Sequence, residues 1–532
     1  MKLFDKTDFL GYVYKIDAQY INFYMPSSLV NANVGGFIVI EGQECGFLAR
    51  ITKMNLHERE NKIIEDSCAS VPVLCKGELL LVFDRKNPSI AQKTVFIYPK
   101  IGEKVFCCAD EQIQKYVESF GKKDEKEPCV PLGSLIASGS VKCNVSLNAL
   151  FKRHCAVVGT TGGGKSWTVA KLMECLSANS DAKIILFDAS GEYNNLQKTK
   201  TYVLGEDSYF PYQKLLISDL FILLRPEGES QKPVLLESIR SLKIARFLQK
   251  GAIFKKAYNS RQEYNALYEK YIEKIEDNSC NFDIMHLIAQ IKEECVLHFA
   301  DAWGASDPKL YDLQASLINK IANMINTDIF NKLFGFKNLP ANHISIIDAV
   351  KTFLEPNQKE NKILRINLET VSSLFSAKEI LANAIGSYFL DKARTGEFRE
   401  NPVILIIDEA HQFLNRKANI DNSQYQPLEA FDLIAKECRK YGLFICLATQ
   451  MPRDIPEGSL SQIGTFIIHR LINEQDKAII ENAVASAGRD ILSFLPSLGE
   501  GEALLIGADF QMPLLVKIDK PQNPPNSVTP SL

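Results

Sequence analysis

The stretch HCAVVGTTGGGKSWTVAKL, residues 154–172, decides the fold class of this chain. Four apolar residues run into a glycine-rich turn, and a lysine, a serine and an amphipathic run follow. Residues 159–166 fit the pattern GxxxxGK[ST], with an expected strand before the turn and an expected helix after it, which is the context that a phosphate-binding P-loop requires. The sequence therefore predicts that a phosphate-bearing ligand binds at this turn.

The residues of this turn have expected roles in binding ATP with Mg²⁺. Glycines let backbone N–H groups converge on phosphate oxygens, and the start of the following helix adds partial positive charge. We expect Lys165 to contact the β- and γ-phosphates and Ser166 to ligate Mg²⁺. A glycine turn that matches the pattern by chance is the alternative. The residues predicted to bind nucleotide are Gly159, Thr160, Thr161, Gly162, Gly163, Gly164, Lys165, Ser166 and Trp167.

A second motif lies in PVILIIDEAH, residues 402–411. Asp408 follows an apolar strand and is predicted to reach Mg²⁺ through water, so Ser166 and Asp408 are the predicted metal residues. Glu409 comes next and is predicted to orient or deprotonate the attacking water. An acidic turn after a buried strand is the alternative, but the pairing with the glycine-rich turn favours ATP hydrolysis.

Three further polar positions follow apolar strands. Gln450 ends the run LATQ, and its amide is predicted to sense the γ-phosphate; a glutamine that only meets solvent is the alternative. Asp188 and Glu192, in FDASGEY, lie at the edge where ligands bind in parallel sheets. For these two residues, coupling to the nucleotide and plain turn chemistry are equal alternatives.

Two arginines are candidates to complete a site shared between subunits, because the γ-phosphate at such a boundary is often contacted by an arginine in trans. Arg439, in AKECRKYGL, ends an expected helix before the LATQ strand. Arg153 directly precedes the strand of the nucleotide loop. For each, a helix-ending arginine that only contacts backbone carbonyls is the alternative.

The composition excludes several classes of protein. The 532 residues carry a net charge of −3, whereas a protein that coats nucleic acid without specificity is usually basic overall. Nucleic-acid binding would therefore be confined to a local basic surface. No apolar run approaches the roughly 18–20 residues that span a bilayer, and the first residues lack a signal-peptide pattern, so we expect a cytoplasmic protein without a membrane segment. The 13 cysteines lack metal-binding spacing and are expected to be buried.

The pattern of apolar runs divides the chain into parts. Residues 1–145 contain short β-branched and aromatic runs, typical of a small barrel or sandwich. Residues 146–204 and 401–519 contain apolar strands that alternate with helices, which predicts a parallel sheet covered on both faces. Residues 205–400 show mainly helical periodicity and are predicted to form an inserted bundle. Residues 520–532, rich in proline and serine, are predicted to be a flexible arm.

Together, these motifs resemble the HerA family of hexameric DNA-translocating ATPases, in the HerA/FtsK branch of RecA-like motors. The family pattern usually has DPxGEY and EGRKYG, so Ala189 and Cys438 are departures, but both leave the charged positions intact. A PLGSL-like segment (131–135) also matches the segment that introduces the family's motor after its β-barrel. The resemblance rests on RHCAVVGTTGGGKS (153–166), FDASGEY (187–193), IIDEAH (406–411), CRKYGL (438–443) and ATQ (448–450), which occur in the family's order.

The resemblance implies an α/β fold: a RecA-like P-loop ATPase core with an N-terminal β-barrel and an inserted helical bundle. It also implies a homo-hexamer that surrounds duplex DNA and works with a separate nuclease, sirtuin-like or other effector protein, in DNA end processing or phage defence. Arg439 would act as a finger in trans, and Arg153 would lie near the nucleotide. The catalytic residues that the resemblance implies are Glu409, Lys165, Gln450, Arg439 and Arg153.

Three functions fit these motifs. The first is an ATP-driven translocase on duplex DNA, and the second is a scaffold ring that hydrolyses ATP slowly and activates an effector enzyme. The third, a secretion or conjugation-type ATPase, is disfavoured by the N-terminal β-rich part and by the lack of a membrane segment. Stimulation of ATP hydrolysis by duplex DNA would separate the first two.

Overall fold

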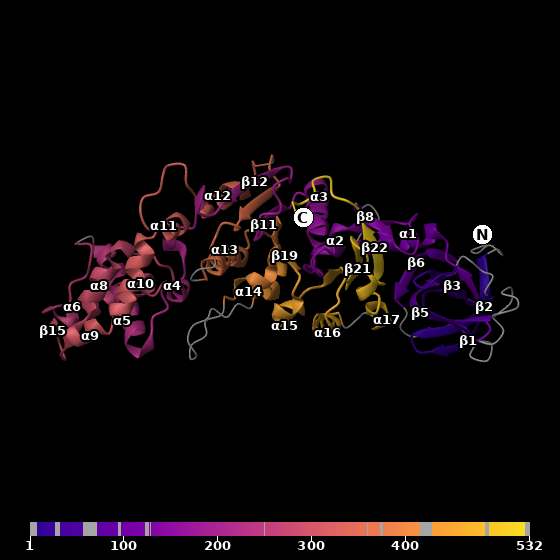
Figure 1. The fold of residues 1–532 in the computed structure, drawn as a ribbon, viewed down its shortest axis with the longest axis horizontal. Helices are drawn as coiled ribbons and strands as arrows, with labels where there is room; N and C mark the ends of the chain where they lie inside the picture. Colours follow the sequence, from indigo (N-terminus) through magenta and orange to yellow (C-terminus); the bar gives the residue numbers. More distant parts are fainter. Residues whose placement is uncertain are drawn as a thin grey trace, which may run out of the picture.

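The computed structural model describes most of the chain, and its three parts lie in a row along the longest axis (Figure 1). A barrel of N-terminal strands lies at one end, an α/β part lies in the middle, and the inserted helices lie at the other end. No helix of the described chain is long and apolar enough to cross a membrane. The described residues are 8–26, 32–56, 72–93, 97–122, 127, 129–248, 251–358, 360–372, 376–414, 428–484 and 489–526.

The N-terminal part is a closed antiparallel barrel. In spatial order its described strands are β2 (Tyr20–Pro26), β1 (Phe9–Asp17), β7 (Lys104–Cys107), β3 (Phe37–Glu41), β4 (Cys45–Leu56) and β5 (Pro72–Asp84). Pairing of β5 with β2 closes the ring, and β6 (Asn87–Lys93) extends from β5. Along β2, Ile21, Phe23 and Met25 alternate into the interior. Of the two folds that the sequence leaves open here, the barrel is confirmed.

The α/β part is built on one large sheet. Its parallel strands, in spatial order, are β12 (Thr199–Val203), β17 (Ile363–Asn367), β11 (Lys183–Asp188), β18 (Val403–Ile407), β19 (Leu443–Thr449), β10 (Cys155–Val158) and β20 (Thr465–Ile468). The sheet continues with the antiparallel strands β21 (Glu502–Gly507), β22 (Leu514–Ile518), β8 (Cys129–Leu135) and β9 (Lys142–Ser146).

Both faces of the parallel strands are buried. Cys155 and Val157 of β10 pack into one apolar core, whereas Ala156 and Val158 pack into another. Alternate residues of a strand point to opposite faces, so a core lies on each side of the sheet. The predicted α/β class is confirmed. The helices of this part include α3 (Lys165–Asn179), α13 (Ala377–Arg394), α14 (Ala430–Glu437) and α16 (Glu474–Ala483).

Two boundaries differ from those that the sequence predicts. Strands β8 and β9 fall mainly within residues 1–145 but pair in the large sheet, where Leu135 lies opposite Val516 of β22. Strand β17 falls within the predicted insertion, 205–400, but lies between β12 and β11. Its apolar run is interrupted by Arg365, which hides the strand in the sequence. The structure buries this arginine in an ion pair with Asp188 at 2.7 Å.

The inserted helices extend from residue 217 to residue 354. In α10 (Ala315–Asn326), Leu317, Ile321, Met324 and Ile325 form a buried stripe at helical spacing. A hairpin of β14 (Val296–His298) and β15 (Trp303–Ser306) lies among the helices. The other helices are α4 (Ile217–Leu224), α5 (Gly228–Leu248), α6 (Arg261–Lys270), α7 (Ile272–Ile275), α8 (Leu287–Glu294), α9 (Pro308–Asp312), α11 (Asp328–Phe334) and α12 (Ile346–Leu354).

The first half of the predicted flexible arm lies against the α/β part. The N–H of Asn523 donates to Oε1 of Glu174 on α3 at 2.8 Å. The N–H of Asn526 donates to the carbonyl oxygen of Glu192 at 2.8 Å. Residues 527–532, the rest of the arm, lie outside the described residues.

Candidate active site

The predicted nucleotide loop lies at the carboxyl end of β10, between the parallel strands β19 and β20. Gly164 has a φ of +106°, and a Cβ at this position would lie 3.0 Å from Cα of Gly501, so the turn requires glycine. Gly164, the residue that precedes α3, has no side chain that could cap the first turn of the helix. The backbone N–H groups of this turn are therefore left for a ligand, at the positive end of the helix dipole. Such a helix start binds phosphate or other anions.

Lys165 is the first residue of α3 and is buried, with 8% of its surface exposed. Its Nζ donates to the carbonyl oxygen of Thr160 at 3.4 Å, so the side chain folds back over the loop. Burial lowers the pKa of Lys165, and the charge of Glu409, followed by that of Asp408, opposes this shift. The lysine therefore lies near both acidic residues of the second motif.

Asp408 follows β18, which is separated from β10 in the sheet only by β19. Its side chain is buried, and its Oδ2 accepts a hydrogen bond from Oγ of Ser190 at 3.2 Å. Burial raises the pKa of Asp408 well above its usual value, and the charge of Glu409 adds to this rise. A bound cation would favour the ionised form of this carboxyl group. The oxygen donors of Asp408 and Ser166 match the preference of Mg²⁺ for hard ligands.

Glu409 has a strained backbone. Its φ of +47° lies in the left-handed region, which costs a residue other than glycine on the order of 1–3 kcal/mol. Its Oε2 lies 3.2 Å from Nδ1 of His411 but is not aligned for a hydrogen bond. Burial raises the pKa of Glu409, and the charge of Lys165 opposes the rise. A carboxylate with a raised pKa beside Lys165 is suited to accept a proton from water.

Gln450 follows β19 and therefore lies between the two motifs. Its Oε1 accepts a hydrogen bond from Oγ1 of Thr161, in the glycine-rich loop, at 2.6 Å. The adjacent Thr449 places its Oγ1 3.3 Å from Nδ1 of His411, which lies beside Glu409. A chain of contacts thus connects the loop to the second motif through the end of β19.

His469 is a residue of this site that the sequence motifs do not identify. It follows β20 and is fully buried, with its Nδ1 2.9 Å from the carbonyl oxygen of Glu502. Because a carbonyl oxygen only accepts, Nδ1 carries the proton and Nε2 accepts from the Thr168 hydroxyl at 2.9 Å. Burial lowers the pKa of His469 to about 4, so the ring is neutral at neutral pH. Its place directly after an apolar strand is the signal that could have identified it.

Asp188 holds the loop of residues 188–194 against the site. Its Oδ1 accepts from the N–H of Gly191 at 2.8 Å, and its Oδ2 accepts from the N–H of Tyr193 at 3.3 Å. The same Oδ2 also accepts from Nε of Arg365 at 2.7 Å. Asp188 therefore stabilises the turn that follows β11 and also forms a buried ion pair. Both interactions fix the position of this loop.

The two predicted arginines lie at the opposite edge of the sheet. Arg153 precedes β10, and its Nε lies 3.3 Å from Oδ2 of Asp509. Arg439 precedes β19, and its charge adds to burial in lowering the pKa of His154 to about 4. Strand β10 lies between Arg153 and the glycine-rich loop, and β19 lies between Arg439 and Gln450. Both arginines therefore lie at the end of the parallel strands opposite the glycine-rich loop of their own chain.

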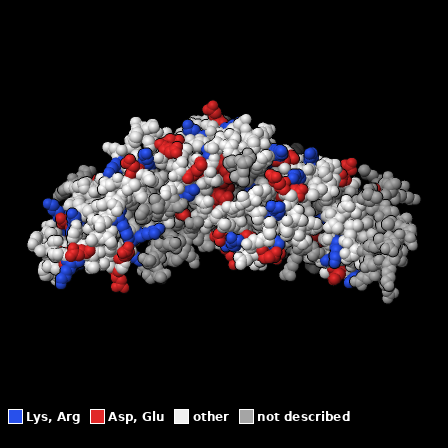
Figure 2. Space-filling view, in the orientation of Figure 1, with Lys and Arg blue, Asp and Glu red and all other residues white. Residues whose placement is uncertain are grey.

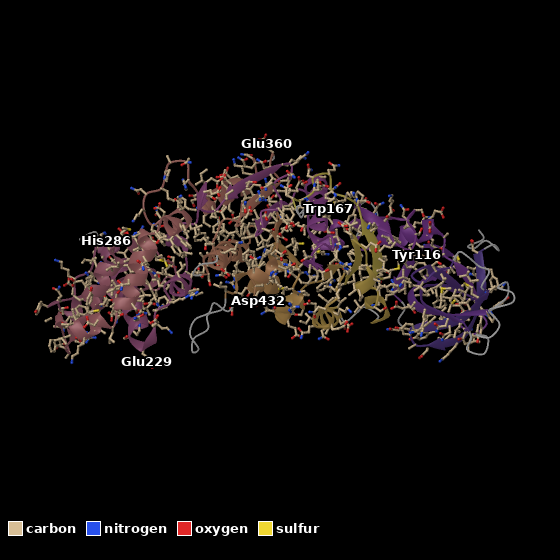
Figure 3. The ribbon with its side chains drawn as sticks, viewed as in Figure 1. Tyr116, Trp167, Glu229, His286, Glu360 and Asp432 are labelled. Carbon is tan, nitrogen blue, oxygen red and sulfur yellow. The ribbon has the colours of Figure 1, made fainter. Side chains whose placement is uncertain are left out.

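Trp167, in the first turn of α3, lies in the central part of the molecule (Figure 3). The Nζ of Lys520, at the start of the C-terminal segment, lies 5.7 Å from the centroid of its ring. The predicted contact of Trp167 with nucleotide stays a prediction.

Comparison with known proteins relates this chain to helicases. Residues 130–388 match the family model described as Helicase HerA, central domain, and residues 379–530 match the model described as Helicase HerA-like C-terminal. The chain is 28% identical to the DNA double-strand break repair helicase HerA of Sulfurisphaera tokodaii, across 74% of this chain and 70% of that protein. It is 26% identical to the protein of the same name from Saccharolobus solfataricus, across 91% of this chain and 87% of that protein.

A search of solved structures gives the bacterial conjugative coupling protein TrwB, with a TM-score of 0.45 at 11% identity, over 79% of this chain and 94% of that chain. The two family models together cover residues 130–530, which include the glycine-rich loop, the Asp408–Glu409 pair and Gln450. The resemblance noted from the sequence is thus confirmed, and the chain is an ATPase that belongs to the HerA helicase family.

Proposed function

We propose that this chain forms a homo-hexameric ring that hydrolyses ATP at its subunit boundaries and moves along duplex DNA. The observation that carries the proposal is the separation of two sets of groups. Lys165, Asp408 and Glu409 lie at the carboxyl edge of the sheet, whereas Arg439 and Arg153 lie at the amino edge. A neighbour would bring an arginine of its amino edge to each site, and a head-to-tail contact of this kind can close into a ring.

Each group at the carboxyl edge has a role in this proposal. Lys165 contacts the β- and γ-phosphates, and Ser166 and Asp408 hold the Mg²⁺ ion that accompanies ATP. The ion neutralises negative charge on the phosphate oxygens. Glu409 orients the attacking water and accepts its proton. Gln450 responds to loss of the γ-phosphate through its hydrogen bond with Thr161.

Duplex DNA and an effector protein are the partners in this proposal. Two relatives are named as DNA double-strand break repair helicases, which supports DNA as the track. On the face drawn in Figure 2, the described Lys and Arg residues are interspersed with Asp and Glu. A surface with such mixed charge offers no continuous basic path for DNA on that face. We propose a separate nuclease, sirtuin-like protein or other effector as the second partner.

Mixed rings test the shared site. Arg439→Ala subunits should bind ATP but hydrolyse it about 10³-fold more slowly or worse, which is the usual cost of removing an arginine finger. Mixing them with Glu409→Gln subunits should restore part of the activity, because some boundaries then pair an intact Glu409 with an intact Arg439. Lys440→Ala, which alters the adjacent exposed cation, is the matched control and should retain activity.

Subunit exchange must be verified by native mass spectrometry of differently tagged chains. If exchanged rings show no rescue, Arg439 does not act in trans, and Arg153 becomes the candidate. A second measurement separates a motor from a scaffold: duplex DNA should stimulate ATP hydrolysis by the ring. Hydrolysis that is indifferent to DNA would favour a ring that assembles and activates an effector enzyme.

A further inference from the structure

Glu192 lies in a loop whose backbone is fixed on both sides of it. The carboxylate of Asp188 accepts hydrogen bonds from the N–H groups of Gly191 and Tyr193, which are the two neighbours of Glu192. The carbonyl oxygen of Glu192 accepts from the N–H of Asn526 at 2.8 Å. Hydrogen bonds within the chain therefore hold the backbone of Glu192 in place.

The same loop also has no space for a side chain at Gly191. Gly191 has a φ of +79°, and a Cβ at this position would lie 1.9 Å from Oε2 of Glu369. A larger residue would meet both backbone strain and the Glu369 carboxylate. The close packing of this turn fixes the direction in which the Glu192 side chain leaves the backbone.

Another residue of the same loop contacts a proposed ligand of Mg²⁺. Ser190 donates to Oδ2 of Asp408 at 3.2 Å. Tyr193, in the same loop, is buried, and its hydroxyl group has no hydrogen-bond partner among the described residues. The loop therefore reaches Asp408 through Ser190, which lies two residues before Glu192 in the sequence.

The Glu192 carboxylate lies close to the same groups. Its Oε2 is buried and has no hydrogen-bond donor among the described residues. Burial raises the pKa of Asp408 and of Glu409, and the charge of the nearby Glu192 adds to both rises. A buried carboxylate oxygen without a donor is costly unless a bound group supplies one. A metal ligand and a general base account for Asp408 and Glu409, and they leave Glu192 without a role.

We propose that Glu192 is a positioning residue for Mg²⁺, whose free oxygen accepts a hydrogen bond from a water that accompanies the ion between Ser166 and Asp408. The inference rests on the ATP site proposed above. Mg²⁺ gives up its waters reluctantly and usually keeps several in protein sites. Groups that accept hydrogen bonds from the outer shell of a metal commonly change its affinity by about 10–100-fold when they are removed.

The test compares nucleotide affinity with and without the metal. Calorimetry on the full chain would measure the dissociation constant of a non-hydrolysable ATP analogue, in Mg²⁺ and in EDTA, for the wild type and for Glu192→Gln. With Mg²⁺, the variant should bind about 10-fold more weakly or worse. With EDTA, it should bind equally or more tightly, because one carboxylate no longer repels the phosphates. A merely structural role would weaken binding under both conditions.

Two variants serve as controls. Asp408→Asn should also lose its gain from Mg²⁺, whereas Glu174→Gln, which alters another carboxylate that contacts the C-terminal segment, should behave as the wild type. The inference is overturned if Glu192→Gln binds as the wild type does in Mg²⁺, or loses affinity equally with and without the ion. If the wild type binds no analogue, or gains nothing from Mg²⁺, the proposed ATP site fails and the inference fails with it.

Discussion

The polar groups at the two edges of the parallel sheet differ in burial and in backbone strain. At the carboxyl edge, Lys165 and Asp408 are buried near one another, and Glu409 is held in a strained conformation beside them. At the amino edge, Arg439 is exposed and makes no ion pair with the described residues, and the Arg153 side chain is 41% exposed. Buried and strained groups are fixed by the fold of their own chain, whereas exposed arginines are accessible to another molecule. The polar groups at the carboxyl edge are therefore fixed within one chain, whereas the arginines at the amino edge are free to contact another molecule.

The largest expected effect is on the rate of ATP hydrolysis, which depends on the carboxyl edge. Glu409→Gln should slow ATP hydrolysis by about 10²–10⁴-fold, the usual contribution of general acid–base catalysis, because an amide cannot accept the proton. Affinity for ATP should be kept, since Lys165 and the loop are unchanged. Phosphate release and analogue binding measure the two properties separately. Glu437→Gln, near Arg439 at the amino edge, is the control. Wild-type turnover by Glu409→Gln would show that the base lies elsewhere.

The sequence predicted those parts of the molecule that depend on local spacing. The pattern of residues 159–166 and the apolar run before Asp408 are local, so the loop and the strand end could be recognised without the fold. Strands β8 and β9 could not be separated from the barrel, because their place depends on pairing with β22, far along the chain. His469 was missed although it directly follows an apolar strand, because its partner Thr168 is 301 residues away in the sequence. Strand β17 was not recognised because Arg365 interrupts its apolar run. The partner of this arginine, Asp188, lies 177 residues earlier in the sequence.

The next largest expected effect is on the free energy of unfolding, through the ion pair that holds Asp188 at the carboxyl edge. Arg365→Met leaves Asp188 buried without its partner, and breaking a buried pair in this way costs about 3–5 kcal/mol. Lys362→Met, directly before the same strand, removes a pair with the exposed Asp181 and should cost about 0–1 kcal/mol. Urea-induced unfolding measures both changes in the free energy of unfolding. Equal costs would mean that Asp188 does not depend on the ion pair.

The smallest expected effect compares one buried histidine at each edge, His154 and His469. Burial lowers the pKa of each from 6.5 to about 4. Between these values the unfolded chain binds protons that the folded chain does not, so stability is fully present above about pH 6.5 and falls as the pH drops towards 4. Each histidine can contribute at most about 3 kcal/mol to this loss.

His154→Gln and His469→Gln should each flatten the dependence of the unfolding temperature on pH between 6.5 and 4, by similar amounts. The edges differ in a second readout, because only His469 contacts α3, through Thr168, beside the nucleotide loop. His469→Gln should therefore weaken binding of the ATP analogue, whereas His154→Gln, at the edge of the arginines, should leave the affinity of an isolated subunit unchanged. If both variants changed that affinity alike, the two edges would be coupled through β10, and the separation of the site from the amino edge would have to be abandoned.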